Sequence, residues 1–157
     1  MTIKTVMALV SDDRESESSL KTAIAVGQGL DAYVEVLHVR AVPESVIPVV
    51  AGASTAGTVD RLLEGVRAST EERAERTHRL FQDVVLEMSL PLTKADAEPQ
   101  VGRFSIAWHE TQGIESFQVV RHGRLFDLTV LPRPDVGNDN GSTTACLLYT
   151  SPSPRDA

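Results

Sequence analysis

The sequence predicts an α/β protein built on one doubly wound parallel sheet, with the strand order 3-2-1-4 and a fifth strand missing. The first observation behind this prediction is an alternation: short, nearly continuous apolar runs are followed by longer segments whose apolar residues recur every three or four positions. The second is that the short runs lack the in–out alternation of a half-exposed strand. They therefore indicate strands covered on both faces, as in a parallel sheet with helices on either side.

The first strand and the first helix are predicted from the start of the chain. Residues 3–10 form an apolar run, and a cluster of small and acidic residues follows it. A helix is predicted over residues 15–29, where apolar side chains recur at helical spacing. Gly27 should weaken this helix, and Gly29 is the expected C-cap residue.

The second strand is predicted over residues 32–40, and the right-handed crossover rule makes it parallel to the first. His38, near its end, is expected to be a partly buried, hydrogen-bonded histidine. A Pro- and Gly-rich linker over residues 42–58 precedes the longest helix, residues 59–88. One face of that helix is apolar and the opposite face is charged, which is typical of a helix packed on a sheet with its outer side in water.

Two further strands complete the sheet. The third is predicted over residues 104–108 and the fourth over residues 127–131, with a helix over residues 113–125 between them. The prolines that follow the fourth strand cannot continue a central ladder, so they end it. Trp108 is expected to cover the long helix from an edge strand.

Residues 1–135 are predicted to form one domain, and residues 136–157 an irregular tail. From about residue 145 the tail, with its segment LLYTSPSPRDA, resembles translated sequencing-adapter sequence, so the natural chain is expected to continue beyond about residue 144. The missing fifth strand follows from this interpretation of a truncated chain. The alternative is a genuine disordered tail rich in Ser and Pro.

Composition and charge exclude several classes of function. The formal net charge is −7, and the basic residues are scattered among carboxylates, so nucleic acid is not an expected partner. No apolar stretch approaches the about 20 residues of a membrane helix, and no signal-peptide pattern is found, so a cytoplasmic location without membrane contact is expected. The single cysteine, Cys146, excludes an internal disulfide and any multi-cysteine metal site.

Two stretches carry a family likeness. IKTVMALVSDDRESESSLKTAIAVGQGLDAYVEVLHV and the later LFDLTVLPRPD resemble the universal stress protein family, over residues 3 to about 135. The shared features are a first strand that ends in an acidic turn, a helix of the form S-x-x-x-L-x-x-A, a second strand that ends in L-H-V, and a D-L-x-V-x strand. The resemblance implies a flavodoxin-like or adenine-nucleotide-hydrolase-like fold, commonly a homodimer, and in some members adenine-nucleotide binding without strong catalysis.

The sequence departs from the nucleotide-binding members of that family. Those members have G-x-x-G directly after the fourth strand and G-[ST] nine residues later. Here the fourth strand is followed by Pro132, Arg133 and Pro134, while Gly137 and Gly141 are spaced G-x-x-x-G. Without such glycines the backbone cannot approach phosphates closely. The sequence is therefore more similar to the branch of the family that lacks the phosphate loop.

The candidate ligand site lies at the ends of the first, second and fourth strands, where ligands bind in open α/β sheets. Its residues are Ser11, Asp12, Asp13, Val39, Arg40, Pro132 and Arg133. The resemblance places Ser11 where nucleotide-binding members have an Asp. Helix capping is the stronger interpretation of Asp12 and Asp13, and ion pairing that of Arg133. No residue is assigned to catalysis or to a metal.

Three functional hypotheses follow. The leading one is a non-catalytic, universal-stress-type module that dimerises and acts through ligand or protein interaction in a stress response. The alternative is a member that binds an adenine nucleotide, ATP or AMP, at the candidate site; no cofactor follows firmly from the residues themselves. The third, a weak nucleotide hydrolase, shares the fold class but finds no activating base in this sequence.

Overall fold

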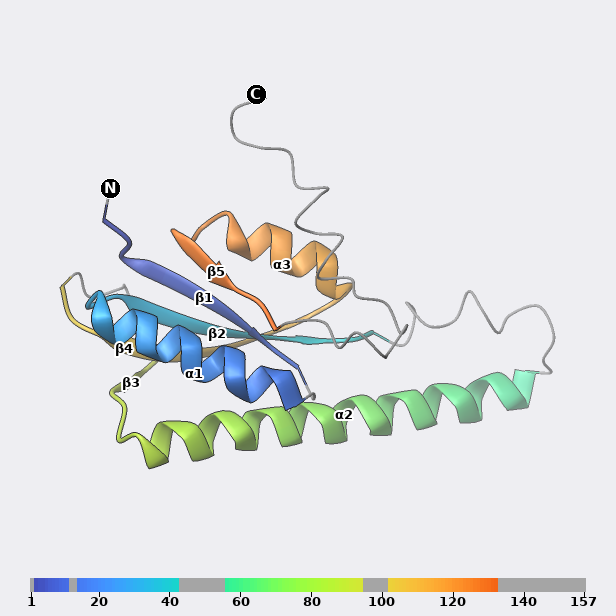
Figure 1. Ribbon diagram of the computed structural model, residues 1–157. Helices are drawn as coiled ribbons and strands as arrows, with labels where there is room; N and C mark the ends of the chain where they lie inside the picture. Colours follow the sequence, from blue (N-terminus) through green and yellow to red (C-terminus); the bar gives the residue numbers. More distant parts are fainter. Residues whose placement is uncertain (1, 12–13, 43–55, 95–101, 133–157) are drawn as a thin grey trace, which may run out of the picture.

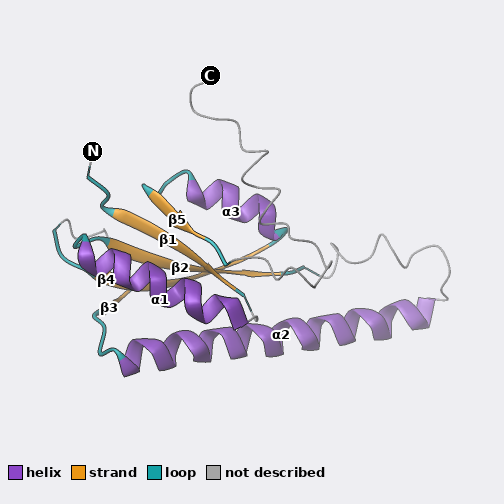
Figure 2. Ribbon diagram, viewed as in Figure 1, coloured by secondary structure: helices purple, strands orange, loops and turns teal. Residues whose placement is uncertain are grey.

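The computed structural model describes residues 2–11, 14–42, 56–94 and 102–132. These residues build one sheet in which all pairings are parallel, in the order β3-β4-β2-β1-β5 (Figure 2). The strands are β1 (Thr5–Val10), β2 (Tyr33–Arg40), β3 (Leu92–Thr93), β4 (Ser105–Gln112) and β5 (Leu128–Val130). The predicted parallel α/β sheet is confirmed.

The four predicted strands keep their predicted order, 3-2-1-4, but the sheet has one strand more at its edge. β3 pairs through Leu92 with Ile106 and through Thr93 with Ala107. Two residues are too few to show a hydrophobic period, which is why the sequence did not predict β3. β4 is also longer than residues 104–108, because its polar half from His109 to Gln112 still pairs with β2. A strand beyond β5 and the tail of residues 136–157 lie outside the described residues.

Helices cover both faces of the sheet (Figure 1). α1 (Arg14–Gly29) and α2 (Ala56–Glu87) lie on one face, and α3 (Glu115–Gly123) lies on the other. The alternation of side chains along β2 sends Val34 and Val36 into the core beneath α1 and α2. It sends Leu37 and Val39 into a smaller core beneath α3. The sheet is therefore buried on both faces, as its apolar strands predict.

Both long helices end in the same way. Asp31 and Ser89 have positive φ angles of 49° and 50°. After α1 the amide of Ala32 donates to the carbonyl of Gly27 at 2.9 Å, and after α2 the amide of Leu90 donates to that of Val85 at 3.0 Å. This is the Schellman arrangement, with a left-handed residue that turns the chain back. The predicted C-cap role of Gly29 is wrong, because Asp31 takes the left-handed conformation instead.

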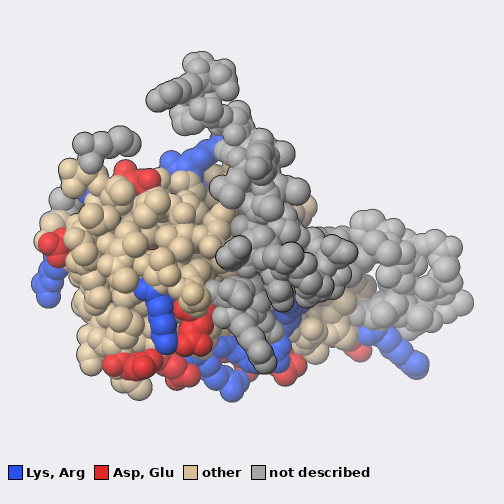
Figure 3. Space-filling view, in the orientation of Figure 1, with Lys and Arg blue, Asp and Glu red and all other residues tan. Residues whose placement is uncertain are grey.

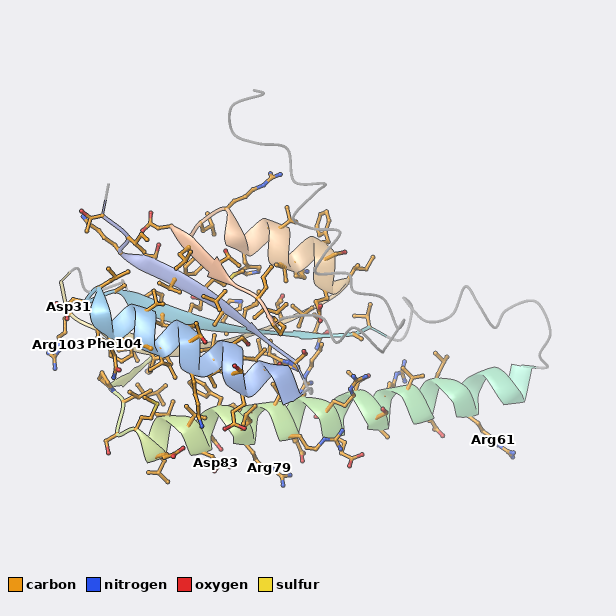
Figure 4. All side chains as sticks on the ribbon, viewed as in Figure 1. Asp31, Arg61, Arg79, Asp83, Arg103 and Phe104 are labelled. Carbon is orange, nitrogen blue, oxygen red and sulfur yellow. The ribbon has the colours of Figure 1, made fainter. Side chains whose placement is uncertain are left out.

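α2 confirms the predicted amphipathic helix and starts three residues earlier, at Ala56. Ala74, Thr77, Phe81 and Val84 are buried against the sheet. Its N-terminal part runs past the carboxyl ends of the strands, where Figure 4 shows Arg61. Acidic and basic side chains alternate on its outer side, along the lower edge of Figure 3. Glu72 pairs with Arg76 at 2.8 Å and Glu75 with Arg79 at 2.9 Å, in the orientation that the helix dipole favours.

Candidate functional site

A hollow of about 110 Å³ opens at the carboxyl ends of β1 and β2, beside α2 and the start of α3. Three of the predicted site residues, Ser11, Val39 and Arg40, line it. They meet because parallel neighbours end at the same edge of a sheet. The other lining residues are His38, Ala41, Thr70, Arg73 and Glu115. The sequence did not predict the lining residues from α2 and α3. Helical periodicity does not show which turn of a helix lies next to the end of which strand.

Ser11 is held by a second serine that the sequence did not single out. The amide of Ser11 donates to Oγ of Ser16 at 2.8 Å, and the two hydroxyl oxygens lie 3.3 Å apart. Ser16, in the first turns of α1, is fully buried. The turn after β1 is thus tied to α1 through Ser16. Asp12 and Asp13, the predicted caps, lie outside the described residues.

Arg40, the last residue of β2, contacts two carboxylates. Its Nε lies 2.9 Å from Oε1 of Glu110 on β4, and one terminal nitrogen lies 3.5 Å from Oε1 of Glu71 on α2. The Nε–H lies outside hydrogen-bonding geometry to Glu110, so this contact is an ion pair rather than a hydrogen bond. Arg40 therefore ties β2 to β4 and to α2, and its charge is already compensated.

His38 confirms the prediction of a buried, hydrogen-bonded histidine. Its Nδ1 lies 3.1 Å from the carbonyl oxygen of Val10, which accepts the Nδ1 proton. Its ring stacks on Trp108 at a centroid distance of 5.8 Å. Burial lowers the pKa of His38 below its ordinary value of 6.5, and the hydrogen bond to Val10 offsets this only in part. In the neutral ring Nε2 is an acceptor, and His38 is one of the residues that line the hollow.

Trp108 packs on the long helix, as predicted. Its ring lies 5.1 Å from the ring of Phe81 and 5.0 Å from that of His78, both on α2. β4 is not the edge of the sheet, however, because β3 lies outside it. This aromatic cluster fills the space between α2 and the strands that carry the hollow.

The third part of the predicted site lies after β5. β5 pairs Val130 with Ala8, and the chain then passes through Pro132, which is buried and does not line the hollow. Arg133 lies outside the described residues. Ser11, Val39 and Arg40 are therefore the predicted site residues that line the hollow.

The described side chains that line the hollow include charges of both signs. Arg40 and Arg73 line it together with Glu115. Glu110 and Glu71 contact Arg40 from outside this lining. Among the residues described, no three His, Cys, Asp or Glu side chains lie close enough to hold a metal ion. No helix in the described ranges is long and apolar enough to cross a membrane.

An open parallel sheet, wound with helices on both faces and hollowed at its carboxyl edge, defines the class: a doubly wound α/β protein of the flavodoxin-like kind. Solved structures give a closer likeness. Universal stress protein UspA from Lactobacillus plantarum is 15% identical, with a TM-score of 0.62 over 97% of this chain and 94% of that chain. The hypothetical protein MJ0577 is 14% identical, with a TM-score of 0.50 over 96% and 92%.

No family model matches the sequence, and no curated protein matches it. The structural likeness is therefore one of fold. This chain has the fold of universal stress protein UspA, and the resemblance predicted from its residues is confirmed at that level.

Proposed function

We propose that this chain is a universal-stress-type module that acts by interaction, through a homodimer or a bound protein or ligand in a stress response, and not by catalysis. The cytoplasm is its expected location. The observation that carries the proposal is that two residues of the candidate site already contact other residues of this chain. Its best ligand-binding side chain, Arg40, is engaged by Glu110 and Glu71, and Ser11 is engaged by Ser16.

The ion pairs of Arg40 favour the interaction module over a nucleotide-binding protein. A phosphate brought to the hollow would have to compete with Glu110 and Glu71 for Arg40. The glycine loop that would bind a phosphate through backbone amides is missing from the sequence.

The volume of the hollow also argues against the binding of a whole nucleotide. The hollow is about 110 Å³, whereas pockets for small molecules and cofactors usually enclose about 300–1,000 Å³. A nucleobase fits such a space better than a whole nucleotide.

The second candidate is an adenine-nucleotide-binding protein of the same fold. What favours it is that Ser11, Val39 and Arg40, predicted from the sequence as ligand residues, do line one hollow at the expected edge of the sheet. The buried acceptor nitrogen of His38 adds a group that could accept a hydrogen bond from a base.

The experiment that separates the two is a titration with fluorescent ATP and AMP analogues, followed by anisotropy. The leading proposal expects no saturable binding up to millimolar ligand. Saturable binding that is weakened in Arg40→Gln and retained in Arg61→Gln would replace it with the second candidate. Arg61 is the matched control because it is exposed near the far end of α2, away from the hollow (Figure 4).

Two further measurements test the rest of the proposal. Sedimentation velocity should show a dimer, and a monomer at all accessible concentrations would remove dimerisation from it. ATP hydrolysis above background that is lost in Asp12→Asn or Asp13→Asn would contradict the non-catalytic part, because these carboxylates are the sequence's candidates for orienting a ribose or a cation.

A further inference from the structure

A second polar cluster lies on the other face of the sheet, beneath the C-terminal end of α3. It consists of Tyr33 and Glu35 on β2, His109 on β4 and His122 on α3, and we call it the histidine cluster. The Tyr33 hydroxyl donates to Oε2 of Glu35 at 3.1 Å, and Oε1 of Glu35 lies 3.9 Å from Nδ1 of His109. The rings of His109 and His122 are 4.9 Å apart and tilted by 56°. The cluster thus runs from the sheet to the helix that covers it.

α3 has few other contacts that hold it in place. It is nine residues long, and Val119 is its one buried residue. Ile114 and Phe117 are exposed by 60% and 67%, so the outer side of the helix gains nothing from packing. At its last residue, Gly123, the helix approaches β1 and β5 closely, where an added Cβ would lie 3.3 Å from Oγ1 of Thr129. His122 is the residue next to this close approach.

The charges around His122 oppose a proton on its ring. Burial lowers the pKa of His122 from its ordinary value of 6.5, and His109 and Arg121 lower it further. His109 and Arg121 are the charged or titratable groups that act on His122, and Glu35 and Tyr33 lie behind His109. Arg124 follows at the C-cap of α3. β1 and β5 meet it through Met7 and Thr129, which do not titrate.

The two histidines differ in what surrounds them. His109 faces the buried carboxylate of Glu35, whose Oε1 lies 3.9 Å from its Nδ1. A proton on His122 has no carboxylate of its own within the cluster and lies next to Arg121. The surroundings of His122 therefore disfavour a proton on its ring.

We propose that the docking of α3 is a pH-sensitive contact: α3 stays on the sheet while His122 is neutral and is released when His122 is protonated. Release would uncover the apolar sheet face that α3 shields, which includes Met7, Leu9, Leu37 and Val39. The direction of the pH dependence follows from the linkage between protonation of His122 and docking of α3. The released helix binds a proton on His122 more readily than the docked helix does, so docking is fully stable above about pH 6.5 and weakens as the pH falls below it.

Hydrogen–deuterium exchange followed by mass spectrometry tests this on the full chain. Between about pH 7.5 and about pH 5.5, after correction for intrinsic exchange, the protection of the α3 amides should fall relative to that of α1. His122→Gln should abolish this relative change. His78→Gln is the matched control, since His78 is another partly buried, ring-stacked histidine but lies on α2, and it should leave the change intact.

Three outcomes would overturn the proposal. The first is α3 protection that does not change with pH relative to α1. The second is a change that persists in His122→Gln. The third is simultaneous loss of protection in α1 and α3, which would indicate global acid unfolding through a group such as the buried His38. In every sample the α1 amides at neutral pH report whether the variant is folded.

Discussion

The close approach of α1 to β2 gives the sharpest test of the packing. Gly27 lies in the last turn of α1, and a Cβ added there would overlap Cγ2 of Val34 and lie 3.1 Å from a ring carbon of Phe104. Val34 is fully buried and has one rotatable side-chain bond, so it cannot swing away. Gly27→Ala therefore forces α1 away from the sheet.

The expected change in the free energy of unfolding is the difference between two opposing effects. Replacing Gly by Ala inside a helix ordinarily gains about 0.8–1 kcal/mol, because Ala has the higher helix propensity. Overpacking a well-filled core costs about 1–3 kcal/mol. We expect the cost to exceed the gain, so that Gly27→Ala lowers the free energy of unfolding by up to about 2 kcal/mol. Gly29→Ala is the matched control: an added Cβ there meets nothing within 4 Å, so only the gain remains.

Urea denaturation of four variants measures both effects: Gly27→Ala, Gly29→Ala, Val34→Ala and the double variant Gly27→Ala/Val34→Ala. If the overlap is the cause, removing Cγ2 relieves it, and the double variant is less destabilised than the two single costs together. Gly27→Ala as stable as Gly29→Ala, or strict additivity with Val34→Ala, would refute the reasoning.

Three other substitutions follow from the same structure. Ser89→Gly should raise the free energy of unfolding by about 0.5–1 kcal/mol in thermal or urea melts, because glycine adopts the positive φ of 50° without strain; no gain would contradict the capping geometry. Phe81→Ala should cost about 3–5 kcal/mol, because Phe81 is fully buried against Trp108, whereas Leu86→Ala on the exposed side of α2 should stay within about 0.5 kcal/mol. Asp127→Asn should lower the melting temperature at neutral pH, since hydrogen bonds from the amides of Lys4 and Thr5 and from the Thr5 hydroxyl hold the pKa of Asp127 below its ordinary value of 3.8. That stabilisation is present above about pH 3.8 and is lost as the pH falls below it, so a difference from the parent protein that persists in stronger acid would refute it.

The sheet was predictable because strands that are buried on both faces appear in the sequence as nearly continuous apolar runs. The apolar runs that end at Val10 and Arg40 gave the central strands nearly to the residue. Short or polar segments were not predictable in this way. β3 is two residues long, and the second half of β4 is polar because its side chains reach the rim of the sheet rather than its core.

The candidate site was predictable in position and less so in chemistry. The rule that ligands bind at the carboxyl edge of parallel strands grouped Ser11, Val39 and Arg40, and the structure places these three around one hollow. Their role in ligand binding stays a prediction. The sequence could not show that Ser16 holds Ser11, or that Arg40 faces Glu71 from a helix that begins many residues later. Such contacts depend on where α2 crosses the strand ends, which local periodicity does not encode.

The pairing of Arg40 links the stability of the fold to its function. An anionic ligand at the hollow would have to compete with Glu110 and Glu71 for the same guanidinium. The contacts it displaced would be subtracted from its binding free energy, so they lower the affinity of this edge for an anion. In a sequence without the glycine loop, Arg40 is better explained as the residue that fixes the strand ends to α2. A phosphate at this edge would have to displace Glu110 and Glu71 from Arg40.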